Sequence, residues 1–300
     1  MPKETLICNG RIVAETHYLP KGYVFIKNGK IASIGEDWSS ITAEEVFDVQ
    51  GRIVSPGFID MHTHGIKDVD FMESDSENMV RGLSEYARFG VIRVVGSTLS
   101  NPLEQIVHQA KRMRIAKENR DYGDILLGVH IEGPWLVPSQ RGGHALQYLR
   151  IPEKDDVNRL LGELGDVIRT VTFSPELPNA VWLAEQLSFH GIVGVLGHTE
   201  ASYEETERVI LAGVRHVTHL YDATYGFKEN PNEALVMMPG LETAVVMCDE
   251  VSVELIGCPV HVPKPFFQYI NKVKPRNKKV IVTDSLVGTG MPDGTTLTYR

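Results

Sequence analysis

Residues Phe58 to Gly65 read FIDMHTHG, an apolar run that ends in two histidines separated by one residue. Side chains two residues apart on a strand point to the same side, so His62 and His64 would face one region together. A buried structural strand gains nothing from imidazoles at both positions, whereas imidazole is a common ligand of zinc and similar divalent cations. The stretch therefore predicts a strand with a metal-binding pair at its carboxyl end.

Similar apolar strands recur down the chain, separated by longer amphipathic stretches that read as helices. The strand candidates are 58–64, 91–99, 124–132, 167–176, 192–200, 216–223, 243–257 and 278–285, and helices are expected at 101–120, 153–165, 179–190 and 202–213. Such alternation predicts right-handed parallel units, and eight strands over about 230 residues favour a TIM-like (β/α)8 barrel. The alternative is a doubly wound open sheet, which the lack of a GxGxxG after any strand weakens slightly.

The segment before the first barrel strand has a different pattern. Residues 1–54 read as short strands separated by turns, and Asn28-Gly29 predicts a hairpin because both residues tolerate positive φ. We therefore expect a small β module over 1–54, the first part of a β-sandwich, and a barrel domain over 55–300. The loop at 225–240 is expected to be the least regular part.

Composition restricts the classes of partner and the cellular location. The formal net charge of -9 makes duplex nucleic acid and anionic membranes poor partners. The chain has 3 cysteines, without a CxxC pattern, which is typical of a reducing compartment rather than a disulfide scaffold. The amino terminus lacks the apolar core of a signal peptide, and no apolar run approaches the roughly 20 residues that span a bilayer. We expect a soluble cytoplasmic protein.

Residues of ligand type follow the ends of five predicted strands. Besides His62 and His64, they are Glu132, His198, His219 and Asp284. Any one of these alone would more often be a hydrogen-bonded structural residue, but the ends of parallel barrel strands converge on one face, where active sites lie. Together they predict a metal site. His130 and Glu176 lie nearby, and either could be a partner that orients a metal ligand. The alternative is a packed histidine for His130 and a solvated charge for Glu176.

The motifs PGFIDMHTHG, VHIEGPWL, RGGHA, SPE, GHTEA, THLYDA and VTDS resemble the amidohydrolase superfamily. Within it, the chain is most similar to the N-acetylglucosamine-6-phosphate deacetylase family, from NGRIV to VTDS. The resemblance implies that Glu132, His198 and His219 bind the catalytic metal. It assigns His62 and His64 to a second metal position in members that keep it.

The resemblance also implies catalytic and substrate-binding roles. Asp284 corresponds to the general base and acid, and His144 to the group that contacts the substrate carbonyl. Residues implied to bind substrate are His144, His261, Asp222, Ala223 and Lys228. This agrees with the chemistry of amide hydrolysis, in which a metal lowers the pKa of water toward about 7 and a carboxylate transfers the proton.

The chain departs from the family pattern around the sugar phosphate. Asp222 stands where the family usually has Asn, Lys228 is offered where it has Arg, and ELIGCPVHV replaces the usual Asp-Gly before His261. A carboxylate repels a phosphate dianion, and Lys lacks the bidentate fork of Arg. Family members also continue past the last strand, so the barrel is expected to be truncated and to lack its last helix.

The expected function is metal-dependent hydrolysis of the acetamide of an N-acetyl amino sugar, with N-acetylglucosamine-6-phosphate as the first choice of substrate. The products would be the amino sugar phosphate and acetate. The alternatives are another reaction of the superfamily, such as a cyclic amidase or a deaminase, and an inactive or truncated metal-binding homologue. One or two divalent metals per subunit are expected, with zinc favoured over iron, cobalt or manganese. The resemblance suggests a homodimer.

Overall fold

The computed structural model describes residues 3–230 and 232–297. Contacts within the chain divide it into two units, Met1–Phe58 and Ile59–Arg300. This division lies a few residues after the boundary that the sequence predicts at 54/55. Each unit has its own buried core, and the residues that carry the chemistry all lie in the second.

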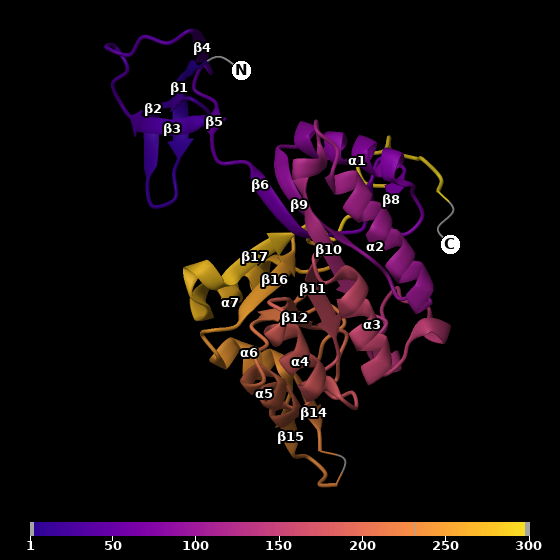
Figure 1. Ribbon diagram of the computed structural model, residues 1–300. Helices are drawn as coiled ribbons and strands as arrows, with labels where there is room; N and C mark the ends of the chain where they lie inside the picture. Colours follow the sequence, from indigo (N-terminus) through magenta and orange to yellow (C-terminus); the bar gives the residue numbers. More distant parts are fainter. Residues whose placement is uncertain (1–2, 231, 298–300) are drawn as a thin grey trace. The chain divides into compact units, whose positions relative to one another are not determined.

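The first unit is a sheet of five strands in the order β3-β2-β1-β4, with β5 paired to β1 (Figure 1). Its strands are β1 (Glu4–Val13), β2 (Tyr18–Lys27), β3 (Lys30–Gly35), β4 (Glu45–Asp48) and β5 (Ile53–Val54). Asn28 and Gly29 connect β2 to β3 with φ of 52° and 75°, as the hairpin signal predicts. The core of this module includes Leu6, Cys8 and Tyr23.

The second unit contains an eight-stranded sheet whose order is β17-β16-β13-β12-β11-β10-β9-β6. Its strands are β6 (Phe58–Thr63), β9 (Val91–Ser97), β10 (Leu126–Glu132), β11 (Ile168–Phe173), β12 (Val193–Leu196), β13 (His216–Val217), β16 (Ser252–Ile256) and β17 (Lys279–Val282). Neighbouring strands from β10 to β17 pair in parallel, and a parallel bridge from Thr63 to Ser285 connects the two ends of the sheet. The predicted (β/α)8 barrel is confirmed.

Asp60 connects the first and last strands of the barrel sheet where the barrel closes. Its carboxylate accepts hydrogen bonds from the Thr283 amide at 3.2 Å and the Thr283 hydroxyl at 2.5 Å. The His62 amide donates to the same carboxylate at 3.3 Å. A buried carboxylate with several donors is well satisfied, so Asp60 ties β6 to the segment after β17.

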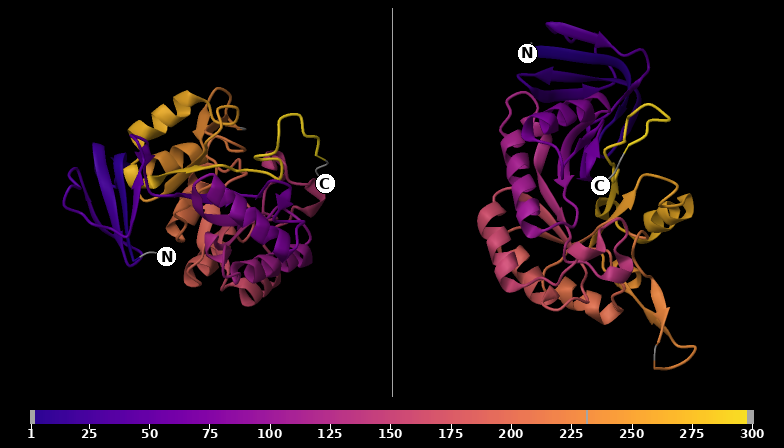
Figure 2. Two further views of the ribbon diagram at one scale, coloured as in Figure 1. Left: turned by 90° about the horizontal axis from the view of Figure 1, so that it is seen from above. Right: turned by 90° about the vertical axis from the view of Figure 1, so that its right-hand side faces the viewer.

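Helices cover the outside of the barrel (Figure 2). They are α1 (Ser76–Arg88), α2 (Leu103–Lys117), α3 (Lys154–Leu164), α4 (Ala180–Phe189), α5 (Tyr203–Leu211), α6 (Leu241–Met247) and α7 (Lys264–Val273). The described residues also contain short 3₁₀ helices at Gly123–Ile125, Pro138–Gln140, Leu146–Tyr148 and Arg276–Lys278. The apolar faces of the helices and strands form one continuous core. Among the described residues, no helix is both long and apolar enough to cross a lipid bilayer.

The predicted strand 243–257 is wrong in its first part. Residues Leu241–Met247 form α6, and only Ser252–Ile256 form the strand β16. Leu241, Ala244 and Val245 are buried at helical spacing, which a run of apolar residues conceals. The amino group of Lys274 donates to the carbonyls of Val245 at 3.0 Å and Cys248 at 2.6 Å, which satisfies the carboxyl end of this short helix.

The second unit also contains two small hairpins and a segment after β17. The loop predicted as irregular contains a two-stranded hairpin of β14 (Phe227–Glu229) and β15 (Met237–Pro239). A small hairpin of β7 (Gly65–Ile66) and β8 (Val69–Asp70) follows β6. The described residues from Thr283 to Leu297 form turns and bends and no helix.

Candidate metal centre

A cavity of about 770 Å³ opens at the carboxyl ends of the barrel strands. Its polar lining includes His64, Glu132, His144, His198, His219, Asp222, His261 and Asp284. Most of the residues predicted from the sequence therefore meet in one place, although they come from points spread along 220 residues of the chain, from His64 to Asp284. The barrel topology brings them together, because the ends of parallel strands lie on the same face.

Glu132, the last residue of β10, lies at the centre of the cluster. Its Oε1 is 3.2 Å from Nε2 of His198 and 3.2 Å from Nε2 of His219. Its Oε2 is 3.1 Å from Nε2 of His64 and 3.4 Å from Nε2 of His62. The carboxylate is almost completely buried, so these imidazoles replace water around it.

Three of the site residues have an unusual backbone conformation at or after the strand ends. His198, His219 and Asp284 have φ of 50°, 24° and 49°, the left-handed region that residues with side chains rarely adopt. Such backbone costs on the order of 1–3 kcal/mol per residue and persists where the surrounding structure enforces it. Its recurrence at three predicted site residues is typical of a functional centre.

The hydrogen bonds of His198 and His219 determine which ring nitrogen carries the proton. Nδ1 of His198 lies 2.8 Å from the Gln140 carbonyl, and Nδ1 of His219 lies 3.1 Å from the Asp222 carbonyl. A carbonyl only accepts, so each Nδ1 must be the donor and each neutral ring directs the lone pair of Nε2 at Glu132. Each lone pair repels the carboxylate oxygen that it faces unless a proton or a metal ion lies between them.

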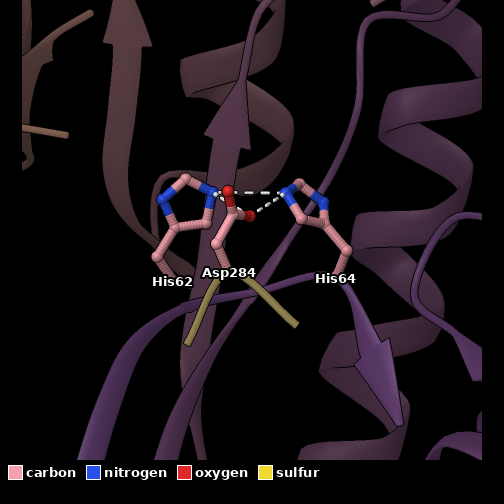
Figure 3. A group of neighbouring side chains, drawn as sticks. All are labelled: His62, His64 and Asp284. Atoms are coloured by element: carbon pink, nitrogen blue, oxygen red, sulfur yellow. Dashed lines mark hydrogen bonds and ion pairs between the residues drawn. The ribbon is translucent and has the colours of Figure 1, made fainter. Parts of the chain in front are cut away.

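His62, His64 and Asp284 form a second group of possible metal ligands (Figure 3). Oδ1 of Asp284 is 3.4 Å from Nε2 of His62 and 3.3 Å from Nε2 of His64. Nδ1 of His64 is buried and has no hydrogen-bond partner among the described residues. The two histidines therefore share a carboxylate through Nε2, while their Nδ1 atoms have different environments.

The pKa shifts show how strongly this cluster demands positive charge. Burial would raise the pKa of Glu132, but the surrounding imidazoles, His62 foremost, outweigh it and hold that pKa well below its usual range. Burial would lower the pKa of His64, but Asp284 and Glu132 raise it to about 9. The cluster thus holds ionised carboxylates that require protons or a metal ion as counter-charge.

The donor set fits a divalent metal. Imidazole nitrogens with fixed lone pairs and carboxylate oxygens are ligands of zinc and of other first-row divalent metals. Ligand atoms of His62, Glu132 and His219 lie within 4.8 Å of one another, as do those of Glu132, His144 and His198. Glu132 with His62, His198 and His219 can therefore hold a metal without a change of fold.

His144 differs from the other imidazoles because its Nδ1 accepts a hydrogen bond. The Ser100 amide donates to this nitrogen at 3.1 Å, so the neutral ring carries its proton on Nε2. Burial lowers the pKa of His144 to about 3, which keeps the ring neutral. Nε2 lies 3.6 Å from Oε2 of Glu132. His144 can therefore donate a hydrogen bond to a group bound in the cavity.

The residues implied to bind the sugar divide into two sets. Asp222 and His261 line the cavity and pair with each other, Oδ2 to Nδ1, at 2.9 Å. Lys228 does not line the cavity, and its amino group donates to the Glu200 carbonyl at 2.9 Å. Ala223 supplies its carbonyl to the Thr199 amide at 3.0 Å. Of the described residues that line the cavity, none is Lys or Arg.

Comparison with known protein families agrees with the family that the sequence motifs resemble. A model described as the amidohydrolase family matches residues 53–284, which is more than half of the chain. The chain belongs to the amidohydrolase family. The match begins just before β6 and ends at Asp284, so it contains every strand of the barrel and every member of the metal cluster.

Individual relatives of this amidohydrolase are deacetylases of amino sugar phosphates. The N-acetylglucosamine-6-phosphate deacetylase of Bacillus subtilis is 27% identical over 98% of this chain and 74% of its own length. The N-acetylgalactosamine-6-phosphate deacetylase of Escherichia coli O157:H7 is 26% identical over 95% of this chain and 72% of its own. Among solved structures, a mutant deacetylase from Mycobacterium smegmatis in complex with N-acetyl-D-glucosamine-6-phosphate has a TM-score of 0.84 at 26% identity, covering 97% of this chain and 73% of that one.

Several buried polar residues of the amidohydrolase barrel are absent from the sequence prediction. Glu254 lies on β16 and contacts His62, His216 and Thr218. Its sequence signal is a carboxylate within the apolar run VELI. Ser100, which determines the His144 tautomer, lies in a loop without a motif and has no such signal.

His130 and Glu176, for which the sequence leaves two readings, both have specific partners. His130 is buried between the Ser97 and Thr172 hydroxyls at 2.9 and 2.7 Å, and burial lowers its pKa to about 3. Glu176 accepts from the Thr199 hydroxyl at 2.6 Å and the Glu200 amide at 2.7 Å, so it holds the loop after His198. His130 is therefore a neutral histidine packed inside the barrel, and the Glu176 carboxylate orders the loop after His198.

Proposed function

We propose that this amidohydrolase hydrolyses the acetamide of an N-acetyl amino sugar with the help of a divalent metal. N-acetylglucosamine-6-phosphate is the first substrate, and the products are the amino sugar phosphate and acetate. The observation that carries the proposal is the position of Nε2 of His198 and Nε2 of His219, each 3.2 Å from the same oxygen of Glu132. Deacetylase relatives with this fold support the choice of bond.

The proposed metal ligands are Glu132, His198 and His219, with His62 and His64 available for a second position. Zinc is the first choice, and iron, cobalt and manganese accept the same donors. A divalent cation held there would polarise the acetamide carbonyl and lower the pKa of water. The chain itself positions the reacting groups around that centre.

Asp284 is the proposed proton carrier. Burial would raise its pKa, but His62 and His64 outweigh this and hold the pKa below its usual range, so the group is ionised at neutral pH. The carboxylate can take a proton from the attacking water and transfer it to the nitrogen of the leaving amine. This transfer is needed because an unprotonated amide nitrogen is a poor leaving group.

His144 is the proposed donor to the substrate carbonyl. Its Nε2–H faces the cavity, and the Ser100 amide fixes that tautomer. A neutral donor aimed at the carbonyl oxygen stabilises the negative charge that develops there during attack. The proposed contacts to the hydroxyl groups of the sugar are His261 and Asp222, and Lys228 is the candidate cation for a phosphate once it leaves the Glu200 carbonyl.

Acetate release tests the proposal on three substrates. Metal-loaded protein is incubated with N-acetylglucosamine-6-phosphate, its galactosamine epimer and unphosphorylated N-acetylglucosamine. We expect release from a phosphorylated sugar to be the fastest. Acetate release from only the unphosphorylated sugar would show that the substrate is not a sugar phosphate. Release from none of the three sugars, by protein with stoichiometric metal, would overturn the proposal.

A further inference from the structure

Glu254 and Thr218 lie behind the metal cluster, away from the cavity, and the chemistry proposed above does not use them. Both side chains are buried, and Glu254 is 3% exposed. The Thr218 hydroxyl donates to Oε2 of Glu254 at 2.9 Å. The other carboxylate oxygen, Oε1, lies 2.8 Å from Nε2 of His216, which holds the carboxylate from the opposite side.

This arrangement determines the tautomer of His62. Nδ1 of His62 lies 2.9 Å from the Thr218 hydroxyl and 3.4 Å from Oε2 of Glu254. A hydroxyl has one proton, and Thr218 uses its proton on Glu254, so its oxygen must accept from Nδ1–H of His62. In the neutral ring, the form that binds a metal, Nε2 of His62 then has a free lone pair, directed at Oε2 of Glu132 and Oδ1 of Asp284, each 3.4 Å away.

Packing holds the same groups in place. A Cβ on Gly197 would lie 2.3 Å from Cγ2 of Thr218, so the glycine leaves the space that the threonine methyl occupies. The ring of His62 packs edge-on against His130 with centroids 4.6 Å apart. By contrast, Nδ1 of His64 has no partner among the described residues, so nothing holds a proton on that nitrogen as Thr218 does for His62.

We propose that Glu254 and Thr218 are positioning residues that hold His62 with its Nε2 lone pair toward the metal centre and so strengthen metal binding. A ligand whose tautomer is already selected loses no free energy to proton rearrangement or ring rotation when the metal binds. The inference rests on the proposed metal-dependent function, but it concerns a hydrogen-bond relay that can be observed without the metal.

The test compares zinc affinity, measured by competition with a chelator of known affinity, across four variants. Thr218→Val keeps the shape and removes the hydroxyl, and Glu254→Gln removes the carboxylate. Each is expected to bind zinc about 10–100-fold more weakly than the parent protein. Thr218→Ser retains the hydroxyl and is expected to stay within about three-fold, as partial rescue of the relay.

Thr170→Val is the matched control. Thr170 is also a buried threonine on a barrel strand, but its hydroxyl has no hydrogen-bond partner among the described residues. It should leave zinc affinity within about three-fold, because removing an unpaired hydroxyl breaks no relay. A folded Thr218→Val protein with parental zinc affinity would overturn the proposal.

Nitrogen-15 spectra of the imidazoles in the metal-free parent protein provide a second measurement that needs no variant to fold. At a pH high enough for the ring to be neutral, we expect the single ring proton of His62 to be on Nδ1. Protonation of His62 at Nε2 instead would overturn the inference directly. If the parent protein binds no zinc at all, the proposed function fails, whereas these spectra still decide whether the relay selects the His62 tautomer.

Discussion

His198 and His219 direct Nε2 at the same carboxylate oxygen of Glu132, 3.2 Å from each ring. Backbone carbonyls of Gln140 and Asp222 hold the Nδ1 protons of the two rings, so neither Nε2 carries a proton in the neutral form. This is the arrangement expected of metal ligands rather than of a hydrogen-bonded pair.

Glu132→Gln should abolish stoichiometric metal binding. The amide keeps the size of the side chain but removes the negative charge shared by the imidazoles around it. Elemental analysis after gel filtration measures metal per chain. Glu163→Gln is the control, because Glu163 lies on the surface of α3 with Lys111 and Arg159 as partners. Parental metal content in Glu132→Gln would remove Glu132 from the ligand set.

Asp284→Asn should retain at least one metal and lose turnover. An amide cannot accept a proton from water, and the loss of general acid–base catalysis lowers kcat by about 10²–10⁴-fold. Steady-state acetate release and metal content are measured on the same preparation. Asp293→Asn, an exposed carboxylate near the end of the described chain, should keep parental kcat. A kcat within a few-fold of the parent in Asp284→Asn would exclude the aspartate as proton carrier.

Asp222→Asn should lower KM for a phosphorylated sugar and change KM for its unphosphorylated counterpart less. The variant removes a carboxylate from a cavity whose described lining has no Lys or Arg. Because Asp222 is partly exposed, solvent screens the repulsion and the expected fall in KM is only about 2–5-fold. Comparing KM for the two sugars supplies the internal control. An equal change for both would show that Asp222 acts through its pair with His261 rather than through charge.

Asp60→Ala should destabilise the barrel. The substitution leaves the Thr283 amide and hydroxyl without their carboxylate acceptor at the closing seam. Hydrogen bonds to charged groups contribute about 1.5–3 kcal/mol, so the free energy of unfolding should fall by about that amount. Urea unfolding monitored by circular dichroism measures it. Asp166→Ala, which removes an exposed ion pair with Arg114, should change it by less than about 1 kcal/mol.

The sequence predicted the barrel because its strands are short apolar runs between amphipathic helices, and the period of each is visible in the residues. It predicted the metal cluster because polar residues such as Glu132 and His219 follow those runs at their carboxyl ends. Strand alternation also placed His62 and His64 on one side, and their Nε2 atoms lie 3.2 Å apart.

What the sequence did not predict depends on contacts between distant segments. Helix α6 reads as a continuation of β16, because a fully apolar stretch such as TAVVM has no distinguishing period. The tautomers of His144 and His62 depend on Ser100 and Thr218, ordinary hydroxyl residues whose roles arise only from their positions in the fold. The Asp222–His261 pair likewise joins residues 39 apart across the cavity mouth.

The most direct test of the central claim is acetate release from N-acetylglucosamine-6-phosphate before and after metal removal. The protein is stripped with a chelator, assayed, and reloaded with one and then two equivalents of zinc, with iron, cobalt and manganese in parallel. Stripped protein is expected to release no acetate above the Glu132→Gln background, and reloading is expected to restore release. Full activity in stripped protein with no detectable metal would contradict it.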